Sequence, residues 1–582
     1  MYPHTVAVAS ALVVATAMSG VAADLVSAPG PKARPPVYLV GGGVRSINPT
    51  SEMLANDDFY LGGYGFGDFK AANQVQIPTT SGRFATGILA DGVSSRALAV
   101  SDGLHTIVLA QIETQGYFAV YKQGPFGINE IRQDAAAQIA VLAANPPELG
   151  NSGKLARVAP APDASEILVD SDHSHGGPDT VGVWGGVPTS YLKLVHDQTV
   201  SAIVDAWRNL KPAQLRYGVA HAGVVGEEAQ FPPTGGSDPV LTNQFSNDPN
   251  NQVMDDEIRV LQASDPDSGA VLATYVNYSA HPTVLGSSNT KVTGDYVGRL
   301  DDLIEQTYGG FGFDQVATLG REQPARSDCP GFTGGDANPD AALCKLDNYA
   351  SRVLAKVQAA VAAAQPLSGT PQVAMNSYLL IDPSTSTVLV SVVYAGAVVG
   401  VPVGRAENPP WLAGSLIGTT VFTGRIGDVL VTGGPGEMYA QIWQKVRDTV
   451  TGLRGYLNVG TAGDFLGYII APLEAYPEPI RRSFFSGDPP PAGANCSSVP
   501  SPVGCPSPIG NDNYFFNVSH TFGERLTCDF LRGAGDVLAG DALKFWTTDE
   551  RCPAFANDLA LPPGFDTQFP QQPDLSGVMP HM

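Results

Sequence analysis

The feature that most constrains this chain is a strand-and-turn pattern that occurs at three places. Short apolar segments over 166–170, 271–277 and 428–432 have the length and composition of buried strands. Each segment is followed by a turn that presents a potential metal ligand. Because ligands bind at the carboxyl ends of strands in open α/β sheets, the pattern predicts an α/β fold with a functional site at these strand ends.

Helices are predicted between and after these strands. In 128–144 apolar residues recur every three to four positions, as on the buried face of a helix. Further helical segments are predicted over 191–210, 296–306, 348–364 and 440–453. The segment 37–111 consists of short apolar runs separated by Gly and Asp, which is typical of β-structure. At 582 residues the chain is too long for one simple core, so one large domain with insertions or two domains are expected.

The charge balance excludes several classes of partner. The chain has 33 Lys and Arg against 56 Asp and Glu, a formal net charge of −23. A nucleic-acid-binding protein would carry a basic patch or stripe, and docking on anionic lipid would need a polybasic segment. Neither nucleic acid nor an anionic membrane surface is therefore an expected partner. The acidic surface instead favours solubility.

The N-terminal residues predict export. An apolar run over 6–14 is followed by small residues up to Ala23, which is typical of a signal peptide over 1–23. The alternative is a buried N-terminal helix, because no Lys or Arg precedes Lys32. No later stretch has the roughly 18 uncharged apolar residues of a transmembrane helix. The mature chain is expected to be secreted, to the extracellular space or the periplasm.

The six cysteines agree with an oxidising compartment. None belongs to a C-x-x-C pair, so zinc ribbons and thioredoxin chemistry are not indicated. Pairing of sequence neighbours is the simplest of the fifteen connectivities that six cysteines allow. It predicts disulfides 329–344, 496–505 and 528–552.

The histidines carry the main chemical signal. His173 and His175 form a His-x-His pair after a strand, where residues i and i+2 leave the same face and can share a metal. Without a metal they would be ordinary polar turn residues. His281 can equally be a buried core histidine, and Glu437 a glutamate favoured by the dipole of the following helix. A metallo-β-lactamase site is disfavoured because Gly177 and Pro178 stand where that motif has its Asp and third His.

Taken together, the motifs resemble the neutral/alkaline (non-lysosomal) ceramidases. The segment 171–180, Ser-Asp-His-Ser-His-Gly-Gly-Pro-Asp-Thr, is similar to that family's Thr-His-Thr-His-Ser-Gly-Pro signature. Further family landmarks follow in the same order over about residues 37–543. They are the glycine-rich opening at 41–65, Asn277–Thr283 with Gly294–Gly298 ("HP … DxxG"), Gly434–Glu437 ("PGE"), Gly467–Tyr476 ("Y … EEY") and Ser519–Thr521.

The resemblance implies a fold, a metal and a reaction. The fold would be the ceramidase catalytic domain, α/β with mixed sheets flanked by helices. One catalytic zinc ion (Zn²⁺) would be held by His173, His281, Glu437 and Tyr476, a donor set that suits this borderline-soft ion. A zinc-bound water would attack the amide of ceramide or a related N-acyl lipid. His175 would act with His173 in the catalytic group, as general base or oxyanion stabiliser.

The chain departs from the family pattern around the substrate. The family's active-site serine has two candidate counterparts, Gly320–Pro324 and Gly335–Pro339, and neither contains a serine; the second has Asn338 in its place. An Asn-Arg substrate motif has no match near 218–228, and Asn517 replaces a family Tyr. Too few residues follow His520 for an immunoglobulin-like C-terminal domain, which needs about 100.

The sequence therefore predicts an exported zinc-dependent amide hydrolase with a ceramidase-like domain over 37–543. An irregular loop over 487–510 interrupts this domain, and an irregular tail over 544–582 follows it. One alternative is a non-catalytic exported binding or surface protein. The other is a zinc hydrolase of a non-lipid amide or ester, with a shallow polar pocket instead of a deep apolar one.

Overall fold

The computed structural model describes most of the chain between Val37 and Leu538. The described residues are 37–56, 58–64, 82–121, 123–144, 159–226, 238–243, 254–320, 322–333, 338–383, 403–405, 415–469, 518 and 522–538. The predicted signal peptide, the loop 487–510 and the tail 544–582 lie outside them. Among the described helices, none has the length and apolar character that crossing a membrane requires.

A mixed nine-stranded sheet forms the centre of the fold. In order across the sheet its strands are β14 (Phe311–Val316), β12 (Val271–Tyr278), β11 (Glu257–Ser264), β8 (Lys211–His221), β1 (Tyr38–Ser46), β5 (Ser94–Ser101), β6 (Thr106–Ile112) and β7 (Ile167–Ser171), with β16 (Gln365–Pro366) beside β8. The pairs β6–β7 and β12–β14 are parallel, and the other pairs are antiparallel. The mixed sheets predicted through the family resemblance are confirmed.

A second, five-stranded sheet packs against the first. It consists of β17 (Val373–Pro383), β19 (Ser415–Ile426), β20 (Val429–Gly433) and β22 (Gly455–Val459), with β18 (Val403–Arg405) beside β19. One core fills the space between the sheets, formed by side chains such as Leu98, Tyr275 and Phe313 from the first and Phe422 and Val431 from the second. Burial of such side chains at roughly 25 cal/mol per Å² is the main force that holds the sheets together.

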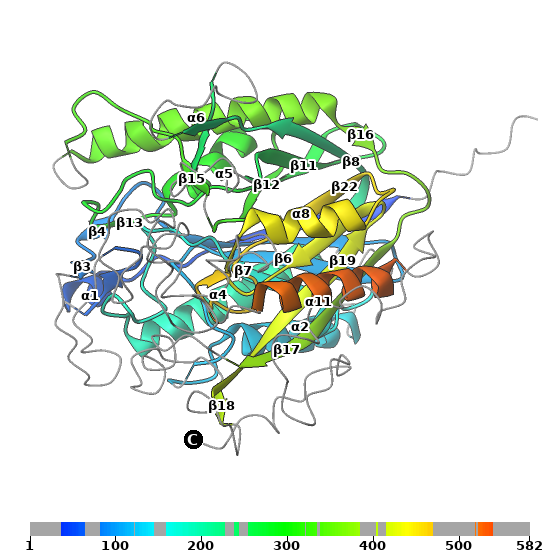
Figure 1. Ribbon diagram of the computed structural model, residues 1–582, viewed down its shortest axis with the longest axis horizontal. Helices are drawn as coiled ribbons and strands as arrows, with labels where there is room; N and C mark the ends of the chain where they lie inside the picture. The colour runs from blue at the N-terminus through cyan, green and yellow to red at the C-terminus, as the bar shows by residue number, and fades with distance from the viewer. Residues whose placement is uncertain are drawn as a thin grey trace, which may run out of the picture. The chain divides into compact units, whose positions relative to one another are not determined.

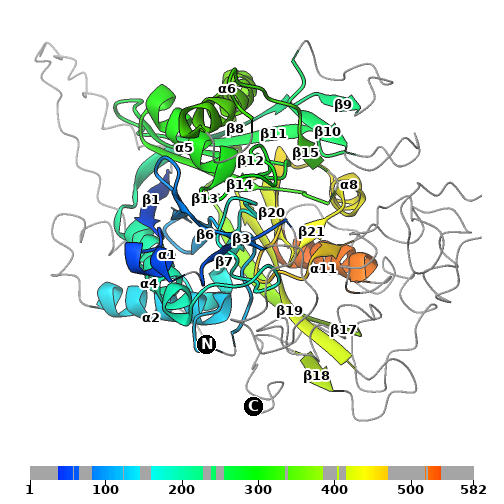
Figure 2. The same cartoon turned by 90° about the vertical axis from the view of Figure 1, so that its left-hand side faces the viewer.

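Helices cover the outer faces of both sheets. Over the large sheet, α4 (Thr189–Arg208) packs on β1 and β5, and α2 (Ile128–Ala144) packs beside α4 and β7 (Figures 1 and 2). Helix α5 (Asp295–Tyr308) packs on β14 and β12, and α6 (Pro339–Ala363) packs on β8 and β11. The second sheet is covered by α8 (Ala440–Thr449) and α11 (Phe522–Val537). At Gly41 in β1, an added Cβ would lie 2.3 Å from the carbonyl oxygen of Ala206, so glycine there permits α4 to pack closely.

Several short elements connect the layers near the strand ends. They are α1 (Ser51–Ala55), a 3₁₀ turn (Ala164–Glu166), the pairs β2 (Tyr60–Leu61) with β3 (Arg83–Phe84), β4 (Gly87–Ile88) with β13 (Lys291–Val292), and β21 (Glu437–Met438) with β23 (Tyr468–Ile469), and a small sheet of β9 (Val224–Gly226), β10 (Leu241–Asn243) and β15 (Glu322–Pro324).

The large sheet is not flat. Strands β1 and β8 pair over only three residues, Tyr38–Val40, so the halves on either side of this junction diverge. The strand directions place β7 antiparallel to β12, and these two strands lie near opposite edges of the sheet order. Nevertheless the Gln315 amide of β14 donates to the Asp170 carboxylate of β7 over 2.6 Å. The bending of the sheet therefore brings together strand ends that a flat sheet would separate.

Most predicted helix ends lie within two residues of the observed ones, as for α4, which spans Thr189–Arg208 against the predicted 191–210, and two ends differ by more. Helix α6 begins nine residues before the predicted start at 348, because the Asn338 side chain caps it and Pro339 occupies its first turn. Helix α8 ends at Thr449, before the predicted end at 453, and Gly452 follows with a φ of 84°. The predicted disulfide Cys329–Cys344 is confirmed, and Cys528 is also disulfide-bonded. The cysteines at 496, 505 and 552 lie outside the described residues.

Candidate metal centre

His173 lies two residues after the end of β7, in a left-handed backbone conformation. Its φ is 63°, which costs a residue other than glycine about 1 kcal/mol. Such strain is common at functional sites, where the surrounding structure maintains it. The His173 Nδ1 donates to the carbonyl oxygen of Gln115 over 2.6 Å, which leaves Nε2 of the neutral ring with a free lone pair. The Phe465 ring stacks on the imidazole with centroids 5.3 Å apart and fixes its plane.

His281 follows β12 and is oriented in the same way. Its Nδ1 donates to the carbonyl oxygen of Glu322 over 2.8 Å, and its backbone N–H donates to that same oxygen over 3.0 Å. These two bonds fix both the ring and its tautomer. As in His173, the Nε2 lone pair of the neutral ring is therefore directed away from the backbone.

Glu437 in β21 places its carboxylate between the two histidines. One carboxylate oxygen lies 3.5 Å from His173 Nε2, and the other lies 3.0 Å from His281 Nε2. In the parallel pair β21–β23, Glu437 is in register with Tyr468, whose side chain hydrogen-bonds the carboxylate. Glu437 therefore lies in a strand before α8 and is not the helix-terminal residue of the alternative interpretation.

Burial sets the charge of these groups. It lowers the pKa of His173 to about 4, with a further decrease from His281, against the opposing effects of Glu437 and the Gln115 carbonyl. Burial also lowers the pKa of His175 well below its usual value, helped by His173, His281 and Arg83. Burial alone would raise the pKa of Glu437, but the two histidines and the Tyr468 hydrogen bond outweigh it and lower that pKa. At neutral pH the site therefore combines the neutral imidazoles of His173 and His175 with an ionised carboxylate.

This arrangement suits a metal cation. The Nε2 atoms of two imidazoles and a carboxylate converge in a buried space. Because Nδ1 is the hydrogen-bond donor in each ring, Nε2 of the neutral form can only accept. A divalent cation would satisfy all three groups at once, and imidazole with carboxylate is a common zinc ligand set. Independently, ring nitrogens of His173, His175 and His281 all lie within 4.8 Å of one another. Among the described residues, this is the group of His, Cys, Asp or Glu that has metal-like spacing.

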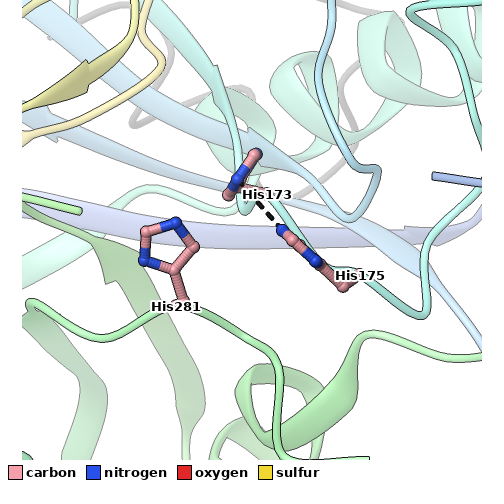
Figure 3. Close-up of side chains that lie close together, drawn as sticks. All are labelled: His173, His175 and His281. Carbon is pink, nitrogen blue, oxygen red and sulfur yellow. Dashed lines mark hydrogen bonds between the residues drawn. The ribbon is translucent and has the colours of Figure 1, made fainter. Parts of the chain in front are cut away.

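His175 is the third histidine of the cluster, and its side chain is half-buried. Figure 3 shows its ring beside that of His173, with the two Nε2 atoms 3.2 Å apart, and His281 facing both from a separate loop. The edge of the His175 ring packs on Tyr64 at a centroid distance of 4.7 Å. The Nδ1 atom of His175 has no hydrogen-bond partner among the described residues. This nitrogen is buried against Gly63, where an added Cβ would lie 2.4 Å from it, so the Nε2 side of the ring is the one that faces His173.

The structure separates the two candidate counterparts of the family's serine. Glu322 and Gln323 lie beside the His281 loop, where Gln323 accepts a hydrogen bond from Thr283 Oγ1 over 2.8 Å. Asn338 is instead the exposed cap of α6. The predicted fourth ligand, Tyr476, and Asn517 lie outside the described residues.

Several residues that contact the candidate ligands were not predicted from the sequence. Phe465 and the Gln115 carbonyl fix the His173 ring, and Tyr468 fixes Glu437. Tyr468 belongs to the quoted 467–476 landmark, so a signal was available for it. Gln115 acts through its backbone and carries no sequence signal.

Comparison with known proteins identifies solved structures with a similar fold. No family model matches this chain, and no curated protein matches it. Among solved structures, the neutral ceramidase from Pseudomonas aeruginosa superimposes with a TM-score of 0.54 at 14% identity, covering 86% of this chain and 74% of that one. A ceramidase complexed with C2 gives a TM-score of 0.53, also at 14% identity, over 86% of this chain and 75% of that one. The chain thus has a neutral-ceramidase-like fold, as the sequence motifs predicted.

Proposed function

We propose that this protein is an exported, zinc-dependent hydrolase of a linear amide bond, with ceramide or a related N-acyl lipid as its substrate. The observation that carries the proposal is the convergence of His173, His281 and Glu437 in a buried space. The neutral-ceramidase-like fold supports the same reaction class. Because a fold does not by itself define a reaction, the proposal depends mainly on the arrangement of these three residues.

Different residues would bind the metal, transfer a proton and orient the ligand histidines. His173, His281 and Glu437 hold the ion, with Tyr476 as the predicted fourth ligand. When bound, zinc supplies a Lewis acid that acidifies water and polarises the scissile carbonyl. His175 would accept and return a proton at Nε2, the ring nitrogen that faces His173, because burial keeps its ring neutral. The carbonyl groups of Gln115 and Glu322 keep the ligand histidines in one tautomer.

The metal is tested first, by elemental analysis of purified protein. Wild type is expected to contain about one zinc per chain, and His173→Ala to lose it. His196→Ala is the matched control, because His196 is also mostly buried but lies on α4 among Asp134 and Asp197. A wild type without stoichiometric zinc, or a His173→Ala protein that keeps it, would contradict the metal assignment.

The substrate is tested with a panel of fluorogenic ceramide, short-chain N-acyl amides and short-chain esters. Hydrolysis of ceramide that stops with a chelator and returns with zinc is the expected result. Release only from short amides or esters would favour a non-lipid hydrolase, for which the polar Gln323 beside His281 is an argument. No release from any substrate by zinc-loaded protein would favour a binding protein.

Export is supported by the apolar N-terminal segment and by the Cys329–Cys344 disulfide, because disulfides persist in oxidising compartments. N-terminal sequencing of the protein recovered from the culture medium or periplasm tests it. A mature chain that begins after Ala23 is expected, whereas full-length protein confined to the cytoplasm would contradict export.

A further inference from the structure

The turn Thr293–Tyr296, which follows β13 and includes the first two residues of α5, contacts the loop that carries His175. The Thr293 N–H donates to the carbonyl oxygen of Gly176 over 3.0 Å. In return the Ser174 hydroxyl donates to the Thr293 carbonyl oxygen over 2.9 Å. An added Cβ at Gly176 would lie 2.5 Å from the Thr293 side chain, so glycine permits this close approach. The turn and the His175 loop are therefore bonded in both directions.

The same turn holds the loop that carries His281. One oxygen of the buried Asp295 carboxylate accepts from the Val284 N–H over 3.0 Å, and the other accepts from the Leu285 N–H over 3.2 Å. On the opposite side of His281, the Tyr296 hydroxyl donates to the Ala280 carbonyl oxygen over 2.8 Å. His281 is thus bracketed by bonds from two consecutive residues of the turn.

The backbone of Asp295 indicates that this arrangement is specific. Its φ is 53°, a left-handed value that costs an ordinary residue about 1 kcal/mol. An acidic residue in the first turn of a helix is common, because it complements the helix dipole. Here, however, two of the three backbone N–H groups that the carboxylate accepts from belong to the His281 loop, and only that of Tyr296 belongs to α5.

The two histidine loops are also joined directly. The His175 N–H donates to the Pro282 carbonyl oxygen over 3.0 Å. Together with the turn, this bond makes one hydrogen-bonded unit of segments from opposite halves of the bent sheet. We infer that Asp295 is a positioning residue of the metal centre, which sets His281 against the His173 loop. The inference rests on the proposed function for the identity of the bound ion.

Asp295→Asn is the sharpest test. Asparagine has the same shape and tolerates a left-handed backbone, but its NH₂ group cannot accept from a backbone N–H. One bond to the Val284–Leu285 backbone is therefore lost. Loss of such outer partners typically costs about 10- to 100-fold in metal affinity, so zinc affinity is expected to fall by at least about 10-fold. The visible bands of the Co²⁺-substituted protein are expected to shift.

Asp102→Asn is the matched control. Its carboxylate also joins a turn to a distant segment, because it accepts from the N–H groups of Leu104, His105 and Val373. This turn lies at the start of β6, whereas the far end of β6 contacts the site, where Ile112 accepts from the Asp172 N–H. Asp102→Asn is expected to lower thermal stability without changing zinc affinity or the Co²⁺ bands.

Tyr296→Phe provides a second, milder variant that removes only the bond to Ala280. It is expected to weaken zinc binding several-fold in the same direction. Unchanged zinc affinity and Co²⁺ bands in both variants would overturn the inference. A wild type that binds no zinc would overturn the proposed function alone. Crystal structures of wild type and Asp295→Asn then decide the inference separately, since an unmoved His281 loop would refute it.

Discussion

Glu437 and Asp314 are two buried carboxyl groups in opposite electrostatic environments. Glu437 is 3% exposed and lies between two imidazole nitrogens, and these neighbours lower its pKa. Asp314 is fully buried, and neither of its side-chain oxygens has a hydrogen-bond partner among the described residues. Burial, with the nearby Asp170, raises the Asp314 pKa well above its usual value.

The difference shows that burial alone does not decide the charge of a carboxyl group. A carboxylate stays ionised in the interior only where donors or cations surround it, and otherwise it keeps its proton. Glu437 has the environment of a group that binds a cation. Asp314 has the environment of a neutral group. Substitutions of the two carboxyl groups, and of His173 beside Glu437, test this difference in charge.

Glu437→Gln is expected to cause the largest loss, in metal affinity. The change removes the negative charge between the two histidines while it keeps the side-chain shape. Zinc affinity, measured by competition with a fluorescent chelator, should fall by more than the roughly 10- to 100-fold that loss of an outer partner costs. Asp314→Asn makes the same chemical exchange and should leave zinc affinity unchanged. Equal zinc affinities of Glu437→Gln and Asp314→Asn would contradict the proposed difference between the two carboxyl groups.

His173→Asn is expected to change how the stability of the metal-free protein depends on pH. The folded-state pKa of His173 is about 4, below the usual 6.5, so the unfolded chain binds the proton more readily. Wild type therefore loses stability as the pH falls from 6.5 through 4, by roughly 3 kcal/mol from this group. The variant should lack this part of the loss. Urea unfolding with a chelator at pH 7.5 and 4.5 measures it, and identical differences for both proteins would contradict the assignment.

Asp314→Asn is expected to have the smallest effect, with the opposite pH dependence. The pKa of Asp314 is raised in the folded state, so its contribution to stability is complete below pH 3.8 and is lost as the pH rises toward the folded-state pKa. The Tm of the variant should therefore gain on that of wild type between pH 4 and 8. Thermal unfolding at both pH values tests this. A gain at pH 4 rather than at pH 8 would mean that Asp314 is ionised in the folded protein.

Much of the local structure was predictable because it depends on patterns within one segment. The periodicity of 128–144 predicted α2 with the ends that it has, and the apolar run 271–277 predicted β12 to within one residue. The start of α6 was missed although Ala342 and Leu346 already continue its buried face, because the helix begins at the Asn338 cap and Pro339, signals that the prediction did not use. Local caps shift helix ends without changing the helical pattern on which the prediction relied.

The site was predictable in part for a related reason. His173, His281 and Glu437 stand out as polar residues after buried strands, and the structure brings all three together. The ligand role of Tyr476 stays a prediction. The groups that orient the ligands were not predictable, because Gln115 and Glu322 act through backbone carbonyls that any residue would supply.

By itself, the sequence determined which residues end the strands, where the helices form and which family the motifs resemble. Each of these follows from periodicity, turn composition or residue order within short segments. Only the tertiary structure decided that the ends of β7 and β12 meet, since their directions and strand order would separate them in a flat sheet. It also decided that Asp295 joins the two histidine loops. Sheet bending and long-range hydrogen bonds depend on packing between distant segments, which no local pattern records.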